Sequence, residues 1–270
     1  MKTIVNMTEY NSGLPWQCQW QSRDHGSEEY GQLFFERATG GAEEMESSKA
    51  AAKRLATILR HQDLLADVGC GGGHYLRSLR REVGQSFAYL GLDATPRYIE
   101  LARKAFANDT MATFELADAY SLNVKDRTVD VTLCANLLLH LPTASKPLSE
   151  LVRITRRRLL IRMLVSDASY VVKRVTPAED GRDFDKHDQP CTFHYLNIYS
   201  EAYIRNQLTQ SGRIHKISFQ LDKDYDPSRI SDSQSLLNIS GWNATDVMQD
   251  MQRSGMLLMP WTWVDVELQD

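Results

Sequence analysis

The middle of the chain alternates between short apolar runs and segments whose apolar residues recur at helical spacing. The first run begins at residue 64, and the next cover residues 87–92, 112–116, 129–134 and 158–165. Runs that are hydrophobic at nearly every position are typical of parallel strands covered on both faces. Helices are expected at about 48–60, after the glycines that follow the first run, from Thr95–Pro96 and from Ser145, so that helices join the strands throughout. This order predicts a doubly wound α/β fold with right-handed crossovers.

The last two strands have a different pattern. Residues 217–221 and 264–268 alternate strictly between apolar and polar side chains. Strict alternation is typical of strands that expose one face, as at the antiparallel edge of a sheet. We therefore expect a mostly parallel sheet that ends in an antiparallel C-terminal hairpin.

The turn after the first strand carries the most specific chemistry. Residues 67–73 read Asp-Val-Gly-Cys-Gly-Gly-Gly. Because glycine lacks a Cβ, the backbone can turn sharply there and a ligand can approach it closely. The dinucleotide fingerprint G-x-G-x-x-G fails, because His74 or Leu76 stands where its third glycine would be. Asp67 would repel a pyrophosphate and favours a ligand with a cationic group, although a purely structural turn remains the alternative.

Acidic residues also follow the second and third strands. Asp93 ends the second strand, where a carboxylate can accept both hydroxyls of a ribose. Asp118 follows the third strand; taken alone, such a residue is more often a solvated loop residue or a helix cap. Three acids after three successive strands instead indicate one ligand site at the carboxyl edge of the sheet, where open α/β sheets bind ligands.

With Asp67, Gly69, Gly71 and Gly73, the first turn has the form acidic-x-Gly-x-Gly-x-Gly, and here the chain resembles the class I S-adenosylmethionine-dependent methyltransferases. The resemblance covers about residues 47–222 and the final strand, and it is most specific over 64–142. It implies a seven-stranded Rossmann-like sheet whose seventh strand lies antiparallel beside the fifth. It also implies S-adenosylmethionine as the cofactor and S-adenosylhomocysteine as the product.

The resemblance assigns roles to particular residues. Asp93 would bind the ribose, Asp118 would accept the exocyclic amine of adenine, and the backbone of Ala119 would contact the ring. The full set of expected cofactor contacts is Asp67, Gly69, Cys70, Gly71, Gly73, Asp93, Ala94, Asp118, Ala119, Asn136 and Tyr30.

Three regions fall outside the repeating strand and helix pattern, and we expect them to determine substrate specificity. Residues 1–46 form an N-terminal leader rich in aromatic side chains, which could close over the cofactor as a lid or simply cover a helix face; Tyr30 is the expected lid contact. Residues 47–270 form the methyltransferase domain, with insertions at about 166–199 and 223–260.

The first insertion is predicted to be a long polar loop that binds the substrate. Its imidazoles, carboxylates and aromatic rings suit a hydroxylated ligand, and Tyr195, Asn197 and Tyr199 are the expected contacts. Asp185, His187, Asp188 and His194 are competent metal ligands, but they lack a recognisable ligand spacing, so no metal is expected. In the second insertion, Trp242 and several methionines could line a substrate pocket or a dimer contact, although packing against the sheet edge is the default interpretation.

Methyl transfer to a hydroxyl group needs a base that removes the proton. A neutral histidine suits this role at physiological pH. His140, just past the fourth strand, is the first candidate and His194 the second; the alternative for His140 is that it merely satisfies backbone groups of the next turn. The Asn/Asp-Pro-Pro-Tyr signature of amide and exocyclic amine methylation is missing, because Leu137 follows Asn136.

These features predict methyl transfer from S-adenosylmethionine to a small polar molecule, by O-methylation of a sugar-like or other hydroxylated metabolite. Residues 195–200 together with Pro260–Trp261 also look similar to methyltransferases encoded among polysaccharide biosynthesis genes. The alternatives are a cofactor-binding regulatory module without transfer activity and an N-methyltransferase, with a nicotinamide-dependent oxidoreductase further behind.

Composition narrows the partners and the location. The net charge of −4 gives no general attraction to nucleic acid, and the triplet Arg156–Arg158 is expected to be a solvated turn before the fifth strand. We expect no membrane partner and a cytoplasmic protein, because neither a long apolar stretch nor a signal sequence is visible. The four cysteines are scattered, so they predict neither a disulfide framework nor a zinc site. The oligomeric state stays open.

Overall fold

A twisted, mostly parallel sheet forms the centre of the computed structural model, which describes residues 28–178, 180–224, 246–248, 251–254 and 257–269. The strand order is β3-β2-β1-β4-β5-β13-β9. The five parallel strands are β1 (Leu64–Val68), β2 (Ala88–Asp93), β3 (Ala112–Leu116), β4 (Val129–Ala135) and β5 (Thr155–Ser166). The strand β13 (Trp261–Leu268) runs antiparallel between β5 and β9 (Ile214–Leu221). The predicted fold class, including its antiparallel edge, is confirmed.

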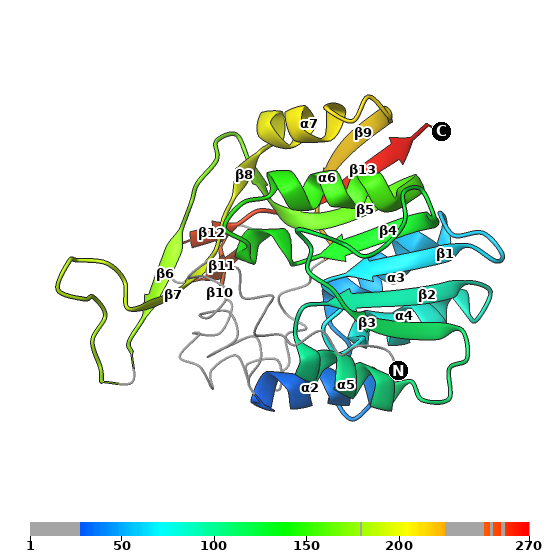
Figure 1. Cartoon of the computed structure of the whole chain (residues 1–270), viewed down its shortest axis with the longest axis horizontal. Coiled ribbons are helices and arrows are strands. Elements are labelled where there is room, and N and C mark those ends of the chain that lie inside the picture. The colour runs from blue at the N-terminus through cyan, green and yellow to red at the C-terminus, as the bar shows by residue number, and fades with distance from the viewer. Residues whose placement is uncertain (1–27, 179, 225–245, 249–250, 255–256, 270) are drawn as a thin grey trace.

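Helices cover both faces of the sheet (Figure 1). On one face, α3 (Glu46–Ala56), α4 (His74–Val83) and α5 (Pro96–Ala105) share a buried core with the strands. On the other face, α6 (Ser145–Ile154) and α7 (Glu201–Thr209) contribute to a second core. All seven residues of β4 are buried, as expected for a central parallel strand between two helical layers.

One connection departs from the expected alternation. Residues 117–128, between β3 and β4, contain turns and a bridge but no helix, so the prediction of a helix in every connection was wrong. Side chains of α6 hold this link instead: Arg153 donates to the carbonyl oxygens of Leu122 and Val124, and Glu150 accepts from the Leu122 N–H. The backbone groups of the link thus find partners without helical hydrogen bonds of their own.

The described part of the N-terminal leader contains a helix, α2 (Glu28–Thr39), where none was predicted before about residue 48. It packs against α4 and α5, since the ring of Phe34 contacts the rings of His74 and Tyr98. Tyr30, Phe34 and Ala38 recur every four residues, which is the helical spacing that could have revealed it.

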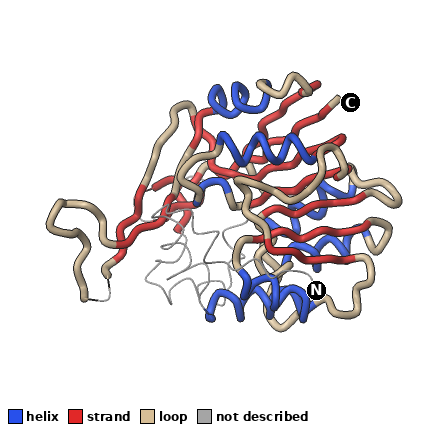
Figure 2. Tube along the Cα trace, in the orientation of Figure 1, coloured by secondary structure: helices blue, strands red, loops and turns tan. Residues whose placement is uncertain are grey.

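Both insertions contain strands. Residues 166–199, predicted as a loop, form the antiparallel hairpin of β6 (Lys173–Thr176) and β7 (Thr192–Tyr195), followed by β8 (Tyr199–Ser200), which pairs with β5. The strands β10 (Asp246–Met248), β11 (Met251–Ser254) and β12 (Leu257–Met259) form a small antiparallel sheet. Figures 1 and 2 show both elements at the end of the central sheet where the parallel strands finish. Trp242 lies outside the described residues, as do residues 1–27 of the leader.

A third small core joins the two insertions to the central sheet. Its buried members are Leu139, Leu164, Leu196, Ile198 and Met259. They come from the turn after β4, from β5, from the first insertion and from the second. Met259 therefore packs against the sheet, as the default interpretation of the second insertion predicts. The two insertions meet at the carboxyl edge of the sheet.

The arginine triplet lies within β5, so the prediction of a solvated turn before that strand was wrong. Each arginine pairs with a carboxylate: Arg156 with Asp130, Arg157 with Asp63 at 2.5 Å, and Arg158 with Asp265 at 2.7 Å. These pairs neutralise the triplet, which therefore offers no basic patch. Within the described part of the chain, no helix has the length and hydrophobicity needed to span a lipid bilayer.

Candidate active site

The glycine loop links β1 to α4 and is fixed to the end of β2. The N–H groups of Gly69 and Cys70 both donate to the carbonyl oxygen of Leu92. Gly73 has a φ of 77°, and a Cβ at this position would lie 2.9 Å from the ring of Phe114. Any larger residue would therefore be strained and would clash, so the loop geometry depends on this glycine.

The carboxylate of Asp93 holds the same loop from β2. Its Oδ2 accepts from the Gly71 N–H and its Oδ1 from the Thr95 N–H, both at 2.9 Å. Burial raises the pKa of Asp93, while hydrogen bonds from the backbone of Thr95, Gly71 and Ala94 oppose the rise. A carboxylate offers about four acceptor positions. Ribose hydroxyls would share these positions with the backbone groups that already orient the side chain.

Asp67 lies beneath the loop and is 2% exposed. The Tyr89 hydroxyl donates to its Oδ2 at 2.7 Å. Burial raises the pKa of Asp67 to about 7, the Tyr89 hydrogen bond counteracts part of this rise, and the charge of Asp93 adds to it. The sequence does not predict Tyr89 as a site residue, because nothing in the local pattern of β2 identifies it as a partner of β1. The attraction of Asp67 for a cationic ligand group remains a prediction.

Asp118 follows β3, beside Asp93 at the end of the neighbouring strand. The Ala117 N–H donates to the carbonyl oxygen of Asp93 at 2.9 Å. Asp118 and Ala119 are half-buried, and Asp118 Oδ1 accepts from the Tyr120 N–H at 2.8 Å. Because β3, β2 and β1 are adjacent, the fold brings the three predicted acids to one edge of the sheet.

Asn136, the first residue after β4, is in the left-handed region with a φ of 59°. Its side chain donates to the Tyr75 hydroxyl at 3.1 Å and accepts from the Arg162 guanidinium at 2.6 Å. Its neighbour Leu137 contacts the glycine loop, since a Cβ at Gly69 would lie 3.0 Å from Leu137 Cβ. The sequence predicts neither Tyr75 nor Arg162 as a site residue.

His140 ends a short 3-10 helix, η1 (Leu138–His140), directly after β4. Its Nδ1 lies 3.1 Å from the carbonyl oxygen of Tyr195 in the first insertion. Because a carbonyl oxygen only accepts, Nδ1 carries the proton and Nε2 keeps the lone pair that a base needs. Burial lowers the pKa of His140 to about 4, against the opposing effect of the Tyr195 hydrogen bond. The imidazole is therefore neutral at physiological pH.

The other predicted substrate residues differ in accessibility. Tyr195 is half-buried, with its ring edge-on to Phe193, and His194 lies beside it on β7, where burial lowers the pKa of the imidazole to about 4. Asn197 is fully buried and bonds to the backbone of Val172 and Leu141. Tyr199 is buried and stacks on Tyr203. Asn197 and Tyr199 thus fix the insertion from inside, His194 is also buried, and Tyr195 is the most accessible of the four.

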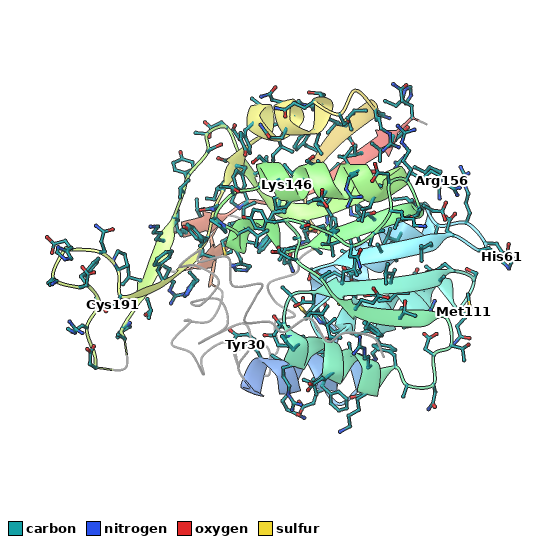
Figure 3. All side chains as sticks on the ribbon, in the orientation of Figure 1. Tyr30, His61, Met111, Lys146, Arg156 and Cys191 are labelled. Carbon is teal, nitrogen blue, oxygen red and sulfur yellow. The ribbon has the colours of Figure 1, made fainter. Side chains whose placement is uncertain are left out.

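The helix α2 covers the glycine loop. A Cβ at Gly72 would lie 2.9 Å from Phe34 Cβ, and the Phe34 ring is 3.4 Å from the equivalent position at Gly71. The ring of Tyr30 lies one helical turn away, with its centroid 6.2 Å from that of Phe34. Figure 3 shows Tyr30 on the first turn of α2 and Cys191 far away in the loop of the first insertion. Phe34, which the sequence does not predict as a site residue, makes the closest described contact of α2 with the loop.

No group of three or more potential metal-binding side chains occurs among the described residues. Asp185, one of the four candidates, accepts hydrogen bonds from the N–H groups of His187 and Gln189 in an exposed turn. Its carboxylate stabilises that turn.

The part of the chain that contains these elements matches a known protein family. Residues 65–158, which include the glycine loop, the three acids and His140, match a family described as a methyltransferase domain. This segment of the chain is therefore similar to a methyltransferase domain. The match agrees with the predicted resemblance to methyltransferases, and the role of the acidic-x-Gly-x-Gly-x-Gly turn as the cofactor loop stays a prediction.

Several solved structures have a similar fold. Phosphoethanolamine N-methyltransferase 2 of Haemonchus contortus, in complex with S-adenosyl-L-methionine, is 14% identical with a TM-score of 0.58, over 95% of this chain and 60% of that one. A second match, at 16% identity and a TM-score of 0.53, is a chain in the complex of the Haloferax volcanii Trm112 methyltransferase activator with a putative methyltransferase. It covers 88% of this chain and 98% of that one. The [4+2]-cyclase SpnF is 15% identical (TM-score 0.52, 82% and 80% covered).

A sequence relative lies in a mobile element. An uncharacterised 37.1 kDa protein of transposon TN4556 in Streptomyces fradiae is 30% identical over 90 residues, which are 33% of this chain and 26% of that protein. The match thus spans about a quarter of the relative's length.

Proposed function

We propose that the protein binds S-adenosylmethionine at the carboxyl edge of the sheet and transfers its methyl group to a hydroxyl of a small polar metabolite. The observation that carries the proposal is the placement of a neutral imidazole, with Nε2 as its basic atom, one turn past β4 on the same edge as the three acids. The family match supports the cofactor, and the acceptor is inferred from the side chains.

The residues at this edge fit the cofactor. The glycine loop exposes backbone where a Cβ would clash, and α4 begins directly after it, so the positive end of the helix dipole faces the loop. Asp93 would bind the ribose hydroxyls, Asp118 and Ala119 the adenine, and Gly69, Cys70, Gly71 and Gly73 the amino-acid portion. When bound, S-adenosylmethionine supplies a methyl group already activated by a sulfonium.

The protein's own task is then to orient the acceptor and remove its proton. Correct positioning of two reactants can supply much of the rate of such a displacement. Tyr195, the more accessible of the two, would bind the acceptor together with the buried His194, and His140 Nε2 would take the hydroxyl proton. The mixture of rings and imidazoles suits a hydroxylated molecule rather than an apolar one.

A screen with methyl-labelled S-adenosylmethionine tests the proposal. Candidate acceptors comprise sugars, phenols and hydroxy acids, together with matched amines. Labelled product from hydroxylated acceptors supports O-methylation, whereas product from amines alone would replace it with N-methylation. Cofactor binding by calorimetry without product from any acceptor would favour a regulatory module.

A further inference from the structure

Arg162 is a buried cation in the second half of β5. Only 4% of the residue is exposed, and it lies between Ala135 of β4 and Trp263 of β13 in the sheet. Its Nε donates to Asp222 Oδ2 at 2.6 Å, and its guanidinium lies 4.1 Å from the ring centroid of Trp261. The Asp222 side chain is itself only 2% exposed. A buried pair of this kind is costly to break, because the remaining charge loses its partner.

Two of the partners of Arg162, Asp222 and Trp261, flank the second insertion. Asp222 is the first residue after β9 and Trp261 is the first of β13, so residues 223–260 leave and rejoin the sheet between them. The Asp222 N–H donates to the carbonyl oxygen of Trp261 at 2.8 Å. Through one ion pair and one cation–π contact, Arg162 therefore holds the stem of that insertion.

On its other side, Arg162 holds the turn after β4. Its Nη1 donates to Asn136 Oδ1 at 2.6 Å, and its carbonyl oxygen accepts from the Asn136 N–H at 2.9 Å. These bonds fix Asn136 at a positive φ, which few residues adopt without support. The chain of bonds continues from Asn136 to the Tyr75 hydroxyl of α4 and from there to Ser47 Oγ of α3.

We propose that Arg162 is a positioning residue that couples the stem of the 223–260 insertion to the cofactor loop. The path runs from Asp222 through Arg162 to Asn136. From Asn136 it continues to Leu137, which contacts Gly69, and to the Tyr75 hydroxyl in α4, the helix that follows the glycine loop. The inference rests on the proposed cofactor site. Its consequence is that Asp222, which lies outside that site, controls cofactor affinity. Coupling between sites is reciprocal, so bound cofactor also stabilises the insertion stem.

The test measures S-adenosylhomocysteine affinity by calorimetry in Asp222→Asn and Arg162→Lys. Arg162→Lys keeps the charge but cannot donate to Asp222 and Asn136 in the same planar geometry. We expect about tenfold weaker binding in each, within the usual range of coupling between sites. Asp265→Asn is the control, because it breaks an arginine–aspartate pair at the opposite end of β5. Its affinity should equal that of the wild type.

A double-mutant cycle separates coupling from general weakening. If one path carries the effect, Asn136→Ala and Asp222→Asn together cost less affinity than the sum of the single losses. Should the charge variants fail to fold by circular dichroism, Tyr75→Phe removes a single hydroxyl from the path and decides the question. Wild-type affinity in folded Asp222→Asn, or in Tyr75→Phe, would overturn the inference. Failure of the wild type to bind would instead overturn the proposed cofactor site.

Discussion

The ring of Phe34 stacks on the imidazole of His74, with centroids 4.5 Å apart and planes inclined by 12°. Phe34 belongs to α2 and His74 is the first residue of α4, immediately after the glycine loop. This stack fixes the leader helix to the loop. It bears on whether α2 is a lid or only a cover for the helices beneath it.

We expect Phe34→Ala to loosen α2 and weaken cofactor binding. Removing a fully buried phenylalanine costs about 3–5 kcal/mol, and a half-buried ring costs less, so the domain should stay folded. Hydrogen exchange with and without S-adenosylhomocysteine is the measurement, with faster exchange expected in α2. Phe35→Ala serves as the control, because that ring contacts Lys104. Unchanged cofactor affinity in Phe34→Ala would favour the covering role.

Acidification should destabilise the protein through His74. Burial lowers the pKa of His74 to about 3, and its Nδ1 has no hydrogen-bond partner among the described residues. The unfolded chain, with a pKa near 6.5, takes up the proton first. The contribution of neutral His74 to the free energy of unfolding is therefore fully present above about pH 6.5. It falls by about 1.4 kcal/mol per pH unit as the pH drops toward 3.

The variant His74→Phe should reduce this pH dependence while keeping a ring against Phe34. Urea unfolding at pH 7, 6 and 5 measures the slope in both proteins. His140 and His194 also have lowered pKa values, so a residual slope is expected in the variant. Identical slopes in the two proteins would show that His74 does not contribute.

Replacing His140 should affect turnover more than cofactor binding. General bases contribute about 10²- to 10⁴-fold, so His140→Asn should lower kcat by at least about 100-fold and leave the KM for S-adenosylmethionine near its wild-type value. Because the basic form of His140 is lost only as the pH falls through about 4, wild-type kcat should not change with His140 ionisation near neutral pH. A full rate in His140→Asn would leave His140 with the alternative role of satisfying the Tyr195 carbonyl.

Removal of the charge at Asp93 should directly weaken the binding of the cofactor. An amide at this position cannot accept through both ends, so one of the N–H groups of Gly71 and Thr95 loses its acceptor. We expect Asp93→Asn to bind S-adenosylhomocysteine at least about tenfold more weakly, since a hydrogen bond to a charged group contributes about 1.5–3 kcal/mol. Calorimetry on the folded variant measures this. Equal binding in both proteins would remove Asp93 from the ribose site.

The sequence predicted the parallel strands well, because their apolar runs and the helical spacing between them are local signals. It failed for residues 117–128, whose partners Glu150 and Arg153 come from a later helix. It also missed the polar partners in the site. Tyr89 meets Asp67 across 22 residues and Arg162 meets Asn136 across 26, so only the assembled sheet reveals these pairs.

The carbonyl group that fixes the protonation of His140 belongs to Tyr195, a residue of the first insertion. An engineer who exchanged this hairpin to admit a different acceptor would therefore also replace the group that keeps Nε2 basic. Under the proposed function, exchanging the hairpin would therefore change the substrate range and the removal of the proton together. A graft would have to restore a carbonyl opposite Nδ1 before its new specificity could be judged.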